Sequence, residues 1–229
     1  MGELEDRKSI LAKKYSIDFD ALEREQVRLA KGIILKNTLD LSEIKTFGAV
    51  ETTFIGNQIL ACFIVCDRNY EVIDSAYDLS RLSFPYFPGF RSYRELPAMI
   101  AAFEKLSQKP DIVFIGGQGI IHPRLGLASH FGLSTGVSTI GVSDSLIDCE
   151  AGTNDKDVIM RAGKKVGNVL VVKEGSKPLY ISPGHNINVE QAYAFSRALV
   201  VLPHKRPQPL HLASKYAKEV VGEFAPAVK

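Results

Sequence analysis

Residues 111–142 read DIVFIGGQGIIHPRLGLASHFGLSTGVSTIGV, and this stretch decides the fold. It contains two short apolar runs, 111–115 and 139–142, which are typical of strands buried on both faces of a sheet. A short helix is expected between them, over about 125–133. Two strands joined through a helix form a βαβ unit, so we expect a parallel pair of strands with a right-handed crossover.

Three extended runs precede this unit. Residues 46–54, 58–65 and 71–79 are rich in β-branched and aromatic side chains, and the links between them are short enough for hairpins. They predict an antiparallel three-strand meander. The other expected elements are a helix over about 20–35, a helix from about Leu96 with Pro97 in its first turn, a hairpin of 168–172 with 179–182, and a helix capped by Asn188 that runs to about Val200.

The order of these elements indicates an α/β fold. A meander followed by parallel strands gives a mixed sheet with helices on both faces, and a ligand site is expected at the carboxyl ends of the strands. We expect one domain over residues 1–229, with an N-terminal helical extension of about 1–36 and a basic C-terminal tail of about 203–229.

Composition narrows the functional classes. Lys and Arg number 28 against 26 Asp and Glu, a formal net charge of +2, so affinity for a phosphate backbone must come from local clusters of cations. The three cysteines include no Cys-x-x-Cys pair, which argues against a disulfide framework and a structural zinc site. No apolar run is long enough to span a membrane, so we expect a cytoplasmic monomer without a membrane partner.

Residues 84–95, FPYFPGFRSYRE, form a loop that combines aromatic rings, prolines and charges. A stiff aromatic loop can insert between bases, and Glu95 at the start of the following helix can hold a metal that in turn holds phosphate. The alternative is a loop packed onto the core, with Glu95 merely favourable near a helix start.

Two glycine-histidine segments follow predicted strands. In the first, 116–123, glycine amides are available to a ligand at close approach, and His122 is expected at the mouth of the strands. The segment lacks the endings of a P-loop and of a dinucleotide fingerprint. In the second, His185 follows Gly184, and a hydrogen-bonded surface histidine is the alternative to a ligand. The pair Lys205-Arg206 either follows a phosphate backbone or is simply solvated.

Several uncommon motifs occur in one order along the chain. Residues 85–95 resemble a Pro-Tyr-Ile-Pro wedge followed by an acidic residue, and Leu106-Ser107-Gln108-Lys109-Pro110-Asp111 leads into the central strand. The further matches are Gly119, His122-Pro123, Ala128-Ser129-His130-Phe131-Gly132, Thr139-Ile140-Gly141-Val142 and Gly184-His185. Together these segments resemble the endonuclease V family, over about 47–202 and most strongly over 85–142.

This resemblance implies an RNase H-like fold and a nuclease dependent on Mg²⁺ or Mn²⁺. The implied substrate is single- or double-stranded DNA or RNA that contains inosine, with the deaminated adenine flipped into a pocket and the strand cut on its 3′ side. The implied wedge is Pro85, Tyr86, Phe87 and Pro88, and the implied base pocket is Gly89, Arg91, Gly117, Gln118, Gly119 and Ile147. The implied metal ligands are Glu51, Glu95 and His185, and the catalytic group is Glu51, Glu95, His122 and Asp144.

The sequence departs from the family pattern at five positions. Glu51 and Gly116 stand where the family has metal-binding aspartates, and Asp144 stands where it has an active-site lysine. Gln118 replaces a common histidine, and Arg91 replaces an apolar residue of the pocket. A magnesium site that relies on a few carboxylates and a phosphate loses an anchor at Gly116.

Two interpretations therefore stay open. In the first, the chain is a metal-dependent endonuclease with Glu51, Glu95 and His185 around Mg²⁺. A separate hypothesis for this enzyme is that Asp144 supplies the lost carboxylate from across the strand ends. In the second, it is a catalytically impaired protein of the same fold that binds nucleic acid without cutting it. A third class, a protein-interaction module, predicts no salt-sensitive binding to DNA.

Overall fold

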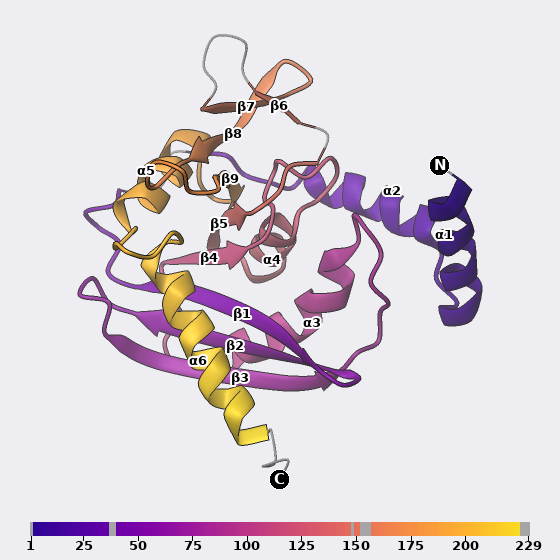
Figure 1. Ribbon diagram of the computed structural model, residues 1–229, viewed down its shortest axis with the longest axis horizontal. Helices are drawn as coiled ribbons and strands as arrows, with labels where there is room; N and C mark the ends of the chain where they lie inside the picture. Colours follow the sequence, from indigo (N-terminus) through magenta and orange to yellow (C-terminus); the bar gives the residue numbers. More distant parts are fainter. Residues whose placement is uncertain (1, 37–39, 148, 152–156, 225–229) are drawn as a thin grey trace.

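A nine-stranded mixed sheet organises the computed structural model, which describes residues 2–36, 40–147, 149–151 and 157–224 (Figure 1). The strand order is β3-β2-β1-β4-β5-β9-β8-β7-β6. The strands are β1 (Phe47–Ile55), β2 (Gln58–Cys66), β3 (Val72–Arg81), β4 (Ile112–Gly116), β5 (Ser138–Ser143), β6 (Glu150–Ala151), β7 (Val158–Arg161), β8 (Lys164–Leu170) and β9 (Leu179–His185).

Strand pairing confirms the predicted topology. β1, β2 and β3 form the antiparallel meander, and β1, β4 and β5 are parallel neighbours. In this register Val50 pairs with Ile115, and Gly116 pairs with Val142. Glu51, Gly116 and the residues after β5 therefore lie at one edge of the sheet, as expected for the carboxyl ends of parallel strands.

Helices cover both faces of the sheet. On one face, α3 (Arg91–Glu104) and α4 (Leu127–Thr135) pack against the strands through an apolar cluster that includes Met99, Phe103 and Phe131. On the other face lie α5 (Val189–Ala198) and α6 (Gln208–Phe224). Figure 1 shows α6, drawn in yellow, crossing β1 and β2. β4 is apolar along its length because both of its faces are covered.

Several boundaries differ from the sequence-based expectation. α3 begins at Arg91 rather than near Leu96, so Pro97 lies inside the helix and not in its first turn. The C-terminal tail is largely helix α6, whose buried face includes Leu210, Ala213 and Val220. The sheet also continues beyond the predicted hairpin, through β7 and β6.

The N-terminal segment forms two helices, α1 (Gly2–Tyr15) and α2 (Phe19–Ala30). α1 lies at the side of the molecule and has no buried residue (Figure 1). Its Leu11 packs against an aromatic cluster centred on Phe19, Phe87 and Phe90. The N-terminal helices therefore pack against residues 84–90, which carry the expected wedge and which we call the wedge loop. Within the described ranges, no helix is long and apolar enough to cross a membrane.

Candidate functional site

Two adjoining cavities open at the carboxyl ends of β4 and β5, beside the middle of β1. The first has a volume of about 210 Å³ and is mostly polar, and the second has a volume of about 340 Å³. Their shared wall consists of Arg91, Gly117, Leu127, Ser143 and Ser145. We call the first the acidic cavity, because Glu51, Glu95 and Asp144 line it, and the second the base cavity.

Every carboxylate of the acidic cavity is next to a cation of the same chain. Arg91 holds Glu95 with both arms of its guanidinium, Nε–Oε1 2.6 Å and Nη2–Oε2 2.9 Å. Asp144 is held by Lys205 Nζ at 3.0 Å and by Arg206 Nη2 at 2.7 Å. Arg206 also reaches Glu51, with Nη1 3.8 Å from Oε2. Three carboxylates and three cations leave the cavity without formal net charge.

The two carboxylates near Arg206 respond differently to their surroundings. Burial raises the pKa of Glu51 above its ordinary value, although Arg206 and Arg91 oppose this shift. Burial also favours the neutral form of Asp144, but hydrogen bonds from Lys205 and Arg206 outweigh it and lower the pKa of that carboxyl. Asp144 is therefore the anion to which the two cations are bound most firmly.

These contacts leave little coordinating capacity for a divalent cation. Both oxygens of Glu95 and both oxygens of Asp144 accept bonds from cations, and Thr52 Oγ1 donates a further bond to Glu95 Oε2 at 2.8 Å. Gly116 contributes no carboxylate at the end of β4. Among the described residues, no group of three or more His, Cys, Asp or Glu is placed to hold a metal ion. The residues present do not fit the Mg²⁺ site that the resemblance implies.

The structure does not bring His185 to this cavity. β9 runs antiparallel to β5, and His185 pairs with Thr139 near the amino end of β5. His185 thus lies at the opposite edge of the sheet from Asp144. Its Nδ1 accepts a hydrogen bond from Ile34 N at 3.3 Å, and the residue is buried. The expected alternative to a metal ligand is a hydrogen-bonded surface histidine. His185 is hydrogen-bonded, but it is buried rather than on the surface.

The base cavity gathers most of the predicted pocket. Gly89, Arg91, Gly117, Gln118 and Ile147 line it, and so do His122 and Ser92. The Gln118 side chain donates to Ser145 O at 3.1 Å, which orients it. No pattern in the sequence singles out Ser92, whose Oγ is buried without a hydrogen-bond partner among the described residues.

Gly119 belongs to the packing behind the base cavity rather than to its lining. A Cβ at this position would collide with the carbonyl oxygen of Pro183 on β9. The Gly119 amide donates to Ser182 Oγ at 3.0 Å, so it is not available to a base. Glycine is required here because the loop after β4 passes directly over β9.

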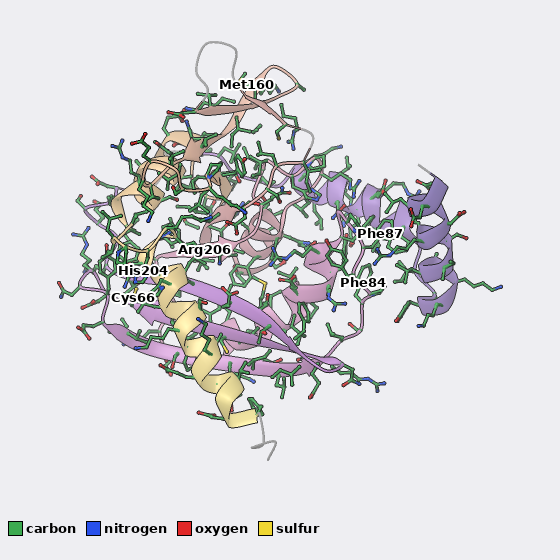
Figure 2. The ribbon with its side chains drawn as sticks, viewed as in Figure 1. Cys66, Phe84, Phe87, Met160, His204 and Arg206 are labelled. Carbon is green, nitrogen blue, oxygen red and sulfur yellow. The ribbon has the colours of Figure 1, made fainter. Side chains whose placement is uncertain are left out.

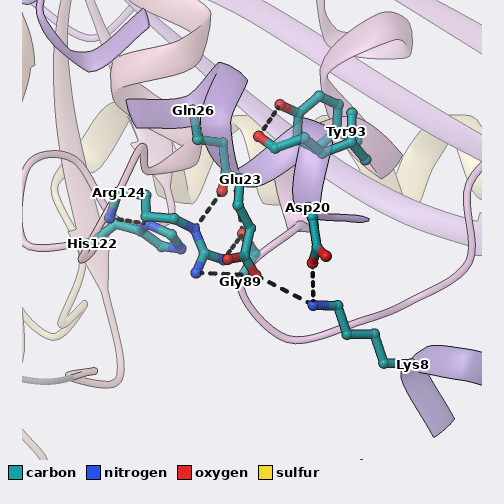
Figure 3. A network of polar contacts seen from close by, with 9 residues as sticks. Lys8, Asp20, Glu23, Gln26, Gly89, Tyr93, His122 and Arg124 are labelled. Carbon is teal, nitrogen blue, oxygen red and sulfur yellow. Dashed lines mark hydrogen bonds and ion pairs between the residues drawn. The ribbon is translucent and has the colours of Figure 1, made fainter. Parts of the chain in front are cut away.

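A polar network fixes the loop at the mouth of the base cavity (Figure 3). Arg124 Nε donates to Gln26 Oε1 at 2.6 Å, and Gln26 Nε2 donates to Gly89 O at 2.9 Å. Arg124 N donates to His122 Nδ1 at 3.1 Å. Gln26 is fully buried although it comes from α2, so the N-terminal extension supports the cavity wall at Gly89 from behind. Neither Gln26 nor Arg124 carries a motif that sequence alone could have singled out.

The wedge loop separates into anchoring and exposed positions. Phe87 is 6% exposed and packs with Phe19 and Phe90, near the N-terminal helices (Figure 2), whereas Tyr86 is 55% exposed. Pro85 is buried and Pro88 is exposed. Arg7 Nη2 donates to Tyr86 O at 3.3 Å. Tyr86 is thus the aromatic side chain that the loop presents to solvent.

His122 is expected to make the protein sensitive to acid. Burial, with smaller effects of Arg124 and Arg161, lowers its pKa from 6.5 to about 4. As the pH falls from about 6.5 to about 4, the unfolded chain takes up a proton that the folded chain resists, so stability decreases by about 3 kcal/mol. His122→Gln is expected to remove this part of the pH dependence in urea denaturation curves. Equal slopes of stability against pH in parent and variant would contradict the assignment.

The architecture is that of an RNase H-like fold with carboxylates gathered at its strand ends. The family model for endonuclease V matches residues 27–215. The chain is 34% identical over 204 residues to endonuclease V of Dictyoglomus turgidum, covering 86% of this chain and 88% of that one. It is 32% identical over 188 residues to endonuclease V of Thermosipho melanesiensis, covering 80% and 83%. The chain therefore belongs to the endonuclease V family.

A solved structure shares the same fold. Endonuclease V of Ciona intestinalis, in complex with a 24mer DNA containing an inosine followed by a ribo-adenosine, superposes with a TM-score of 0.79. The two chains are 20% identical, and the match covers 90% of this chain and 98% of that one. At this level of identity the likeness supports the RNase H-like fold.

Proposed function

We propose that this protein binds deaminated adenine, as hypoxanthine, in nucleic acid and holds it without Mg²⁺-dependent cleavage. The observation that carries the proposal is the contrast between the two cavities. The base cavity is open, and its 340 Å³ volume falls in the range of small-ligand pockets. The neighbouring acidic cavity has its carboxylates bound to cations of the same chain.

The base cavity has the chemistry for a flipped purine. Gly89 and Gly117 line it, and the absence of a Cβ lets the backbone approach a base edge closely. Gln118 and Ser92 add polar side chains, and Leu125 and Leu127 add apolar walls. The Ciona relative binds DNA containing an inosine, which supports hypoxanthine as the base. Tyr86 lines the base cavity and is largely exposed, which supports a role in which its ring occupies the position that the base leaves.

A Mg²⁺-dependent endonuclease is the second candidate. It is favoured by the presence of Glu51, Glu95 and Asp144 around one cavity and by the curated relatives, which are endonucleases V. For this function, Asp144 would have to leave Lys205 and Arg206, and Glu95 would have to leave Arg91. Both carboxylates would then exchange an ion pair for the metal.

The two candidates are separated by one assay. The pure protein is incubated with Mg²⁺ or Mn²⁺ and labelled single-stranded and double-stranded DNA and RNA containing one inosine, with matched adenosine strands as controls. We expect inosine-dependent retention and no cutting. Cutting on the 3′ side of inosine that disappears in Glu51→Gln would establish the endonuclease instead. Absence of both retention and cutting would remove nucleic acid as the ligand.

A further inference from the structure

Arg91 occupies the centre of the site. Besides its paired bonds to Glu95, its Nη1 donates to Gly116 O at 2.9 Å, at the end of β4. A guanidinium carries five N–H donors, and these three contacts use three of them. The Arg91 side chain is 45% exposed, so the remaining N–H groups can reach a ligand oxygen. Arg91 thus places a fixed positive charge between Glu95 and the Gly116 backbone.

Arg206 supplies a second fixed guanidinium across the same cavity. It comes from the loop before α6 and joins Asp144 to Glu51, and its side chain is 36% exposed. Figure 2 shows Arg206 close to the start of α6. Because Lys205 shares Asp144, this carboxylate anchors two cations at the strand ends. The cavity therefore presents two arginines that are oriented by carboxylates, an arrangement suited to bidentate recognition of phosphate oxygens.

The position of Arg91 links the two cavities. It lines both of them, together with Gly117 and Ser143. A nucleotide whose base enters the base cavity has room for its sugar-phosphate chain in the acidic cavity, beyond this shared wall. Its phosphodiester group would then lie beside the free edge of Arg91.

We propose that Arg91, assisted by Arg206, takes the place of a divalent cation and binds the phosphate next to the recognised base, so that the protein holds nucleic acid without metal. This inference rests on the proposed binding of hypoxanthine in nucleic acid. The Arg91 guanidinium performs the charge neutralisation, and Glu95 and the Gly116 carbonyl keep it in position. A cation that belongs to the chain makes the binding independent of Mg²⁺ concentration.

The first test uses the unaltered protein. Fluorescence anisotropy measures the Kd of a labelled single-stranded oligonucleotide with one inosine, in EDTA and in Mg²⁺ at equal ionic strength. The two Kd values are expected to agree within about twofold, because the phosphate contact uses no metal. Inosine-dependent binding that tightens tenfold or more with Mg²⁺ would overturn the metal-free contact and leave the proposed function standing. Absence of inosine-dependent binding in both buffers would overturn the proposed function itself.

The second test removes the cation. Arg91→Gln is expected to weaken binding about tenfold to a hundredfold in EDTA, which is the usual contribution of a hydrogen bond to a charged group. Arg197→Gln is the matched control, because it removes the same charge from an exposed position on α5 and is expected to change Kd less than twofold. Thermal midpoints of both variants confirm that they are folded at the assay temperature. Arg91→Lys keeps the charge but not the paired geometry and is expected to bind with intermediate affinity. Equal affinity of Arg91→Gln and the parent would overturn the proposal.

A competition experiment tests whether the arginines bind the phosphate of a nucleic acid or that of a free mononucleotide. Inosine 5′-monophosphate carries the same base and a phosphate on one nucleotide. We expect it to displace the oligonucleotide only at much higher concentration, because it lacks the neighbouring backbone. Displacement at concentrations comparable to those of the oligonucleotide would overturn the nucleic-acid function and assign the arginine site to a mononucleotide.

Discussion

Phe87→Ala is expected to lower the free energy of unfolding by about 3–5 kcal/mol, the usual loss for truncating a buried phenylalanine. The Phe87 ring lies 4.9 Å from the Phe19 ring and 5.9 Å from the Phe90 ring, measured between centroids. Its removal opens the cluster that joins the wedge loop to the N-terminal helices. Phe87→Leu keeps most of the volume and is expected to cost less than about 1.5 kcal/mol. Urea denaturation of the three proteins measures these differences.

Tyr86→Ala, one residue away, is expected to weaken nucleic-acid binding but to leave the stability of the fold nearly unchanged. Its side chain is largely exposed, so the free energy of unfolding should change by less than about 0.5 kcal/mol. Loss of the ring at the mouth of the base cavity should weaken binding of an inosine oligonucleotide about tenfold to a hundredfold, as for loss of a base stack. Tyr15→Ala on α1 removes the same exposed ring elsewhere and is the matched control. Unchanged affinity in Tyr86→Ala would exclude the ring from recognition.

The spacing of apolar residues and the lengths of the links predicted most of the fold, because they depend directly on which side chains are buried and which strands are neighbours. The all-apolar run of β4 requires cover on both faces, and the short links of the meander permit only antiparallel neighbours. The same patterns cannot fix the direction of a later strand. The family resemblance implies that His185 lies with Glu51 and Glu95 around a metal, at the edge of the sheet where β4 ends. β9 is antiparallel to β5, a relation set by pairing between distant segments, and its end lies at the other edge.

The ion pairs of the acidic cavity also could not be predicted from the sequence. Arg91 and Glu95 form an i,i+4 pair because α3 begins earlier than its proline suggests. Arg206 reaches Asp144 from 62 residues away, and only the packing of α6 on the sheet brings the two together. The sequence therefore showed which family carboxylates had changed. It did not show that the remaining carboxylates are bound to arginine and lysine.

Arg91→Leu combined with Gly116→Asp is expected to create a Mg²⁺ site. A Cβ at Gly116 meets no heavy atom within 4 Å, and Gly116 is not among the glycines with positive φ, so the backbone at the end of β4 accepts a residue with a side chain. Replacing Arg91 frees both Glu95 oxygens from their cation. The two changes move the formal charge of the cavity by two negative units, while Glu51 stays in place. Carboxylates freed in this way are the ligands that Mg²⁺ prefers.

Mg²⁺ at ten times its Kd should then stabilise the double variant by about 1.4 kcal/mol and leave the parent unchanged, because only the folded variant binds the ion. In EDTA the double variant should be less stable than the parent, since Glu95 is 4% exposed and loses its partner. Isothermal titration and thermal midpoints with and without Mg²⁺ measure both effects. Arg91→Leu with Gly116→Asn has nearly the same shape without the new charge and should not respond to Mg²⁺. An equal response of parent and double variant would contradict the expected Mg²⁺ site. Oligonucleotide binding that becomes Mg²⁺-dependent only in the double variant would tie the missing metal site to Arg91 and Gly116 together.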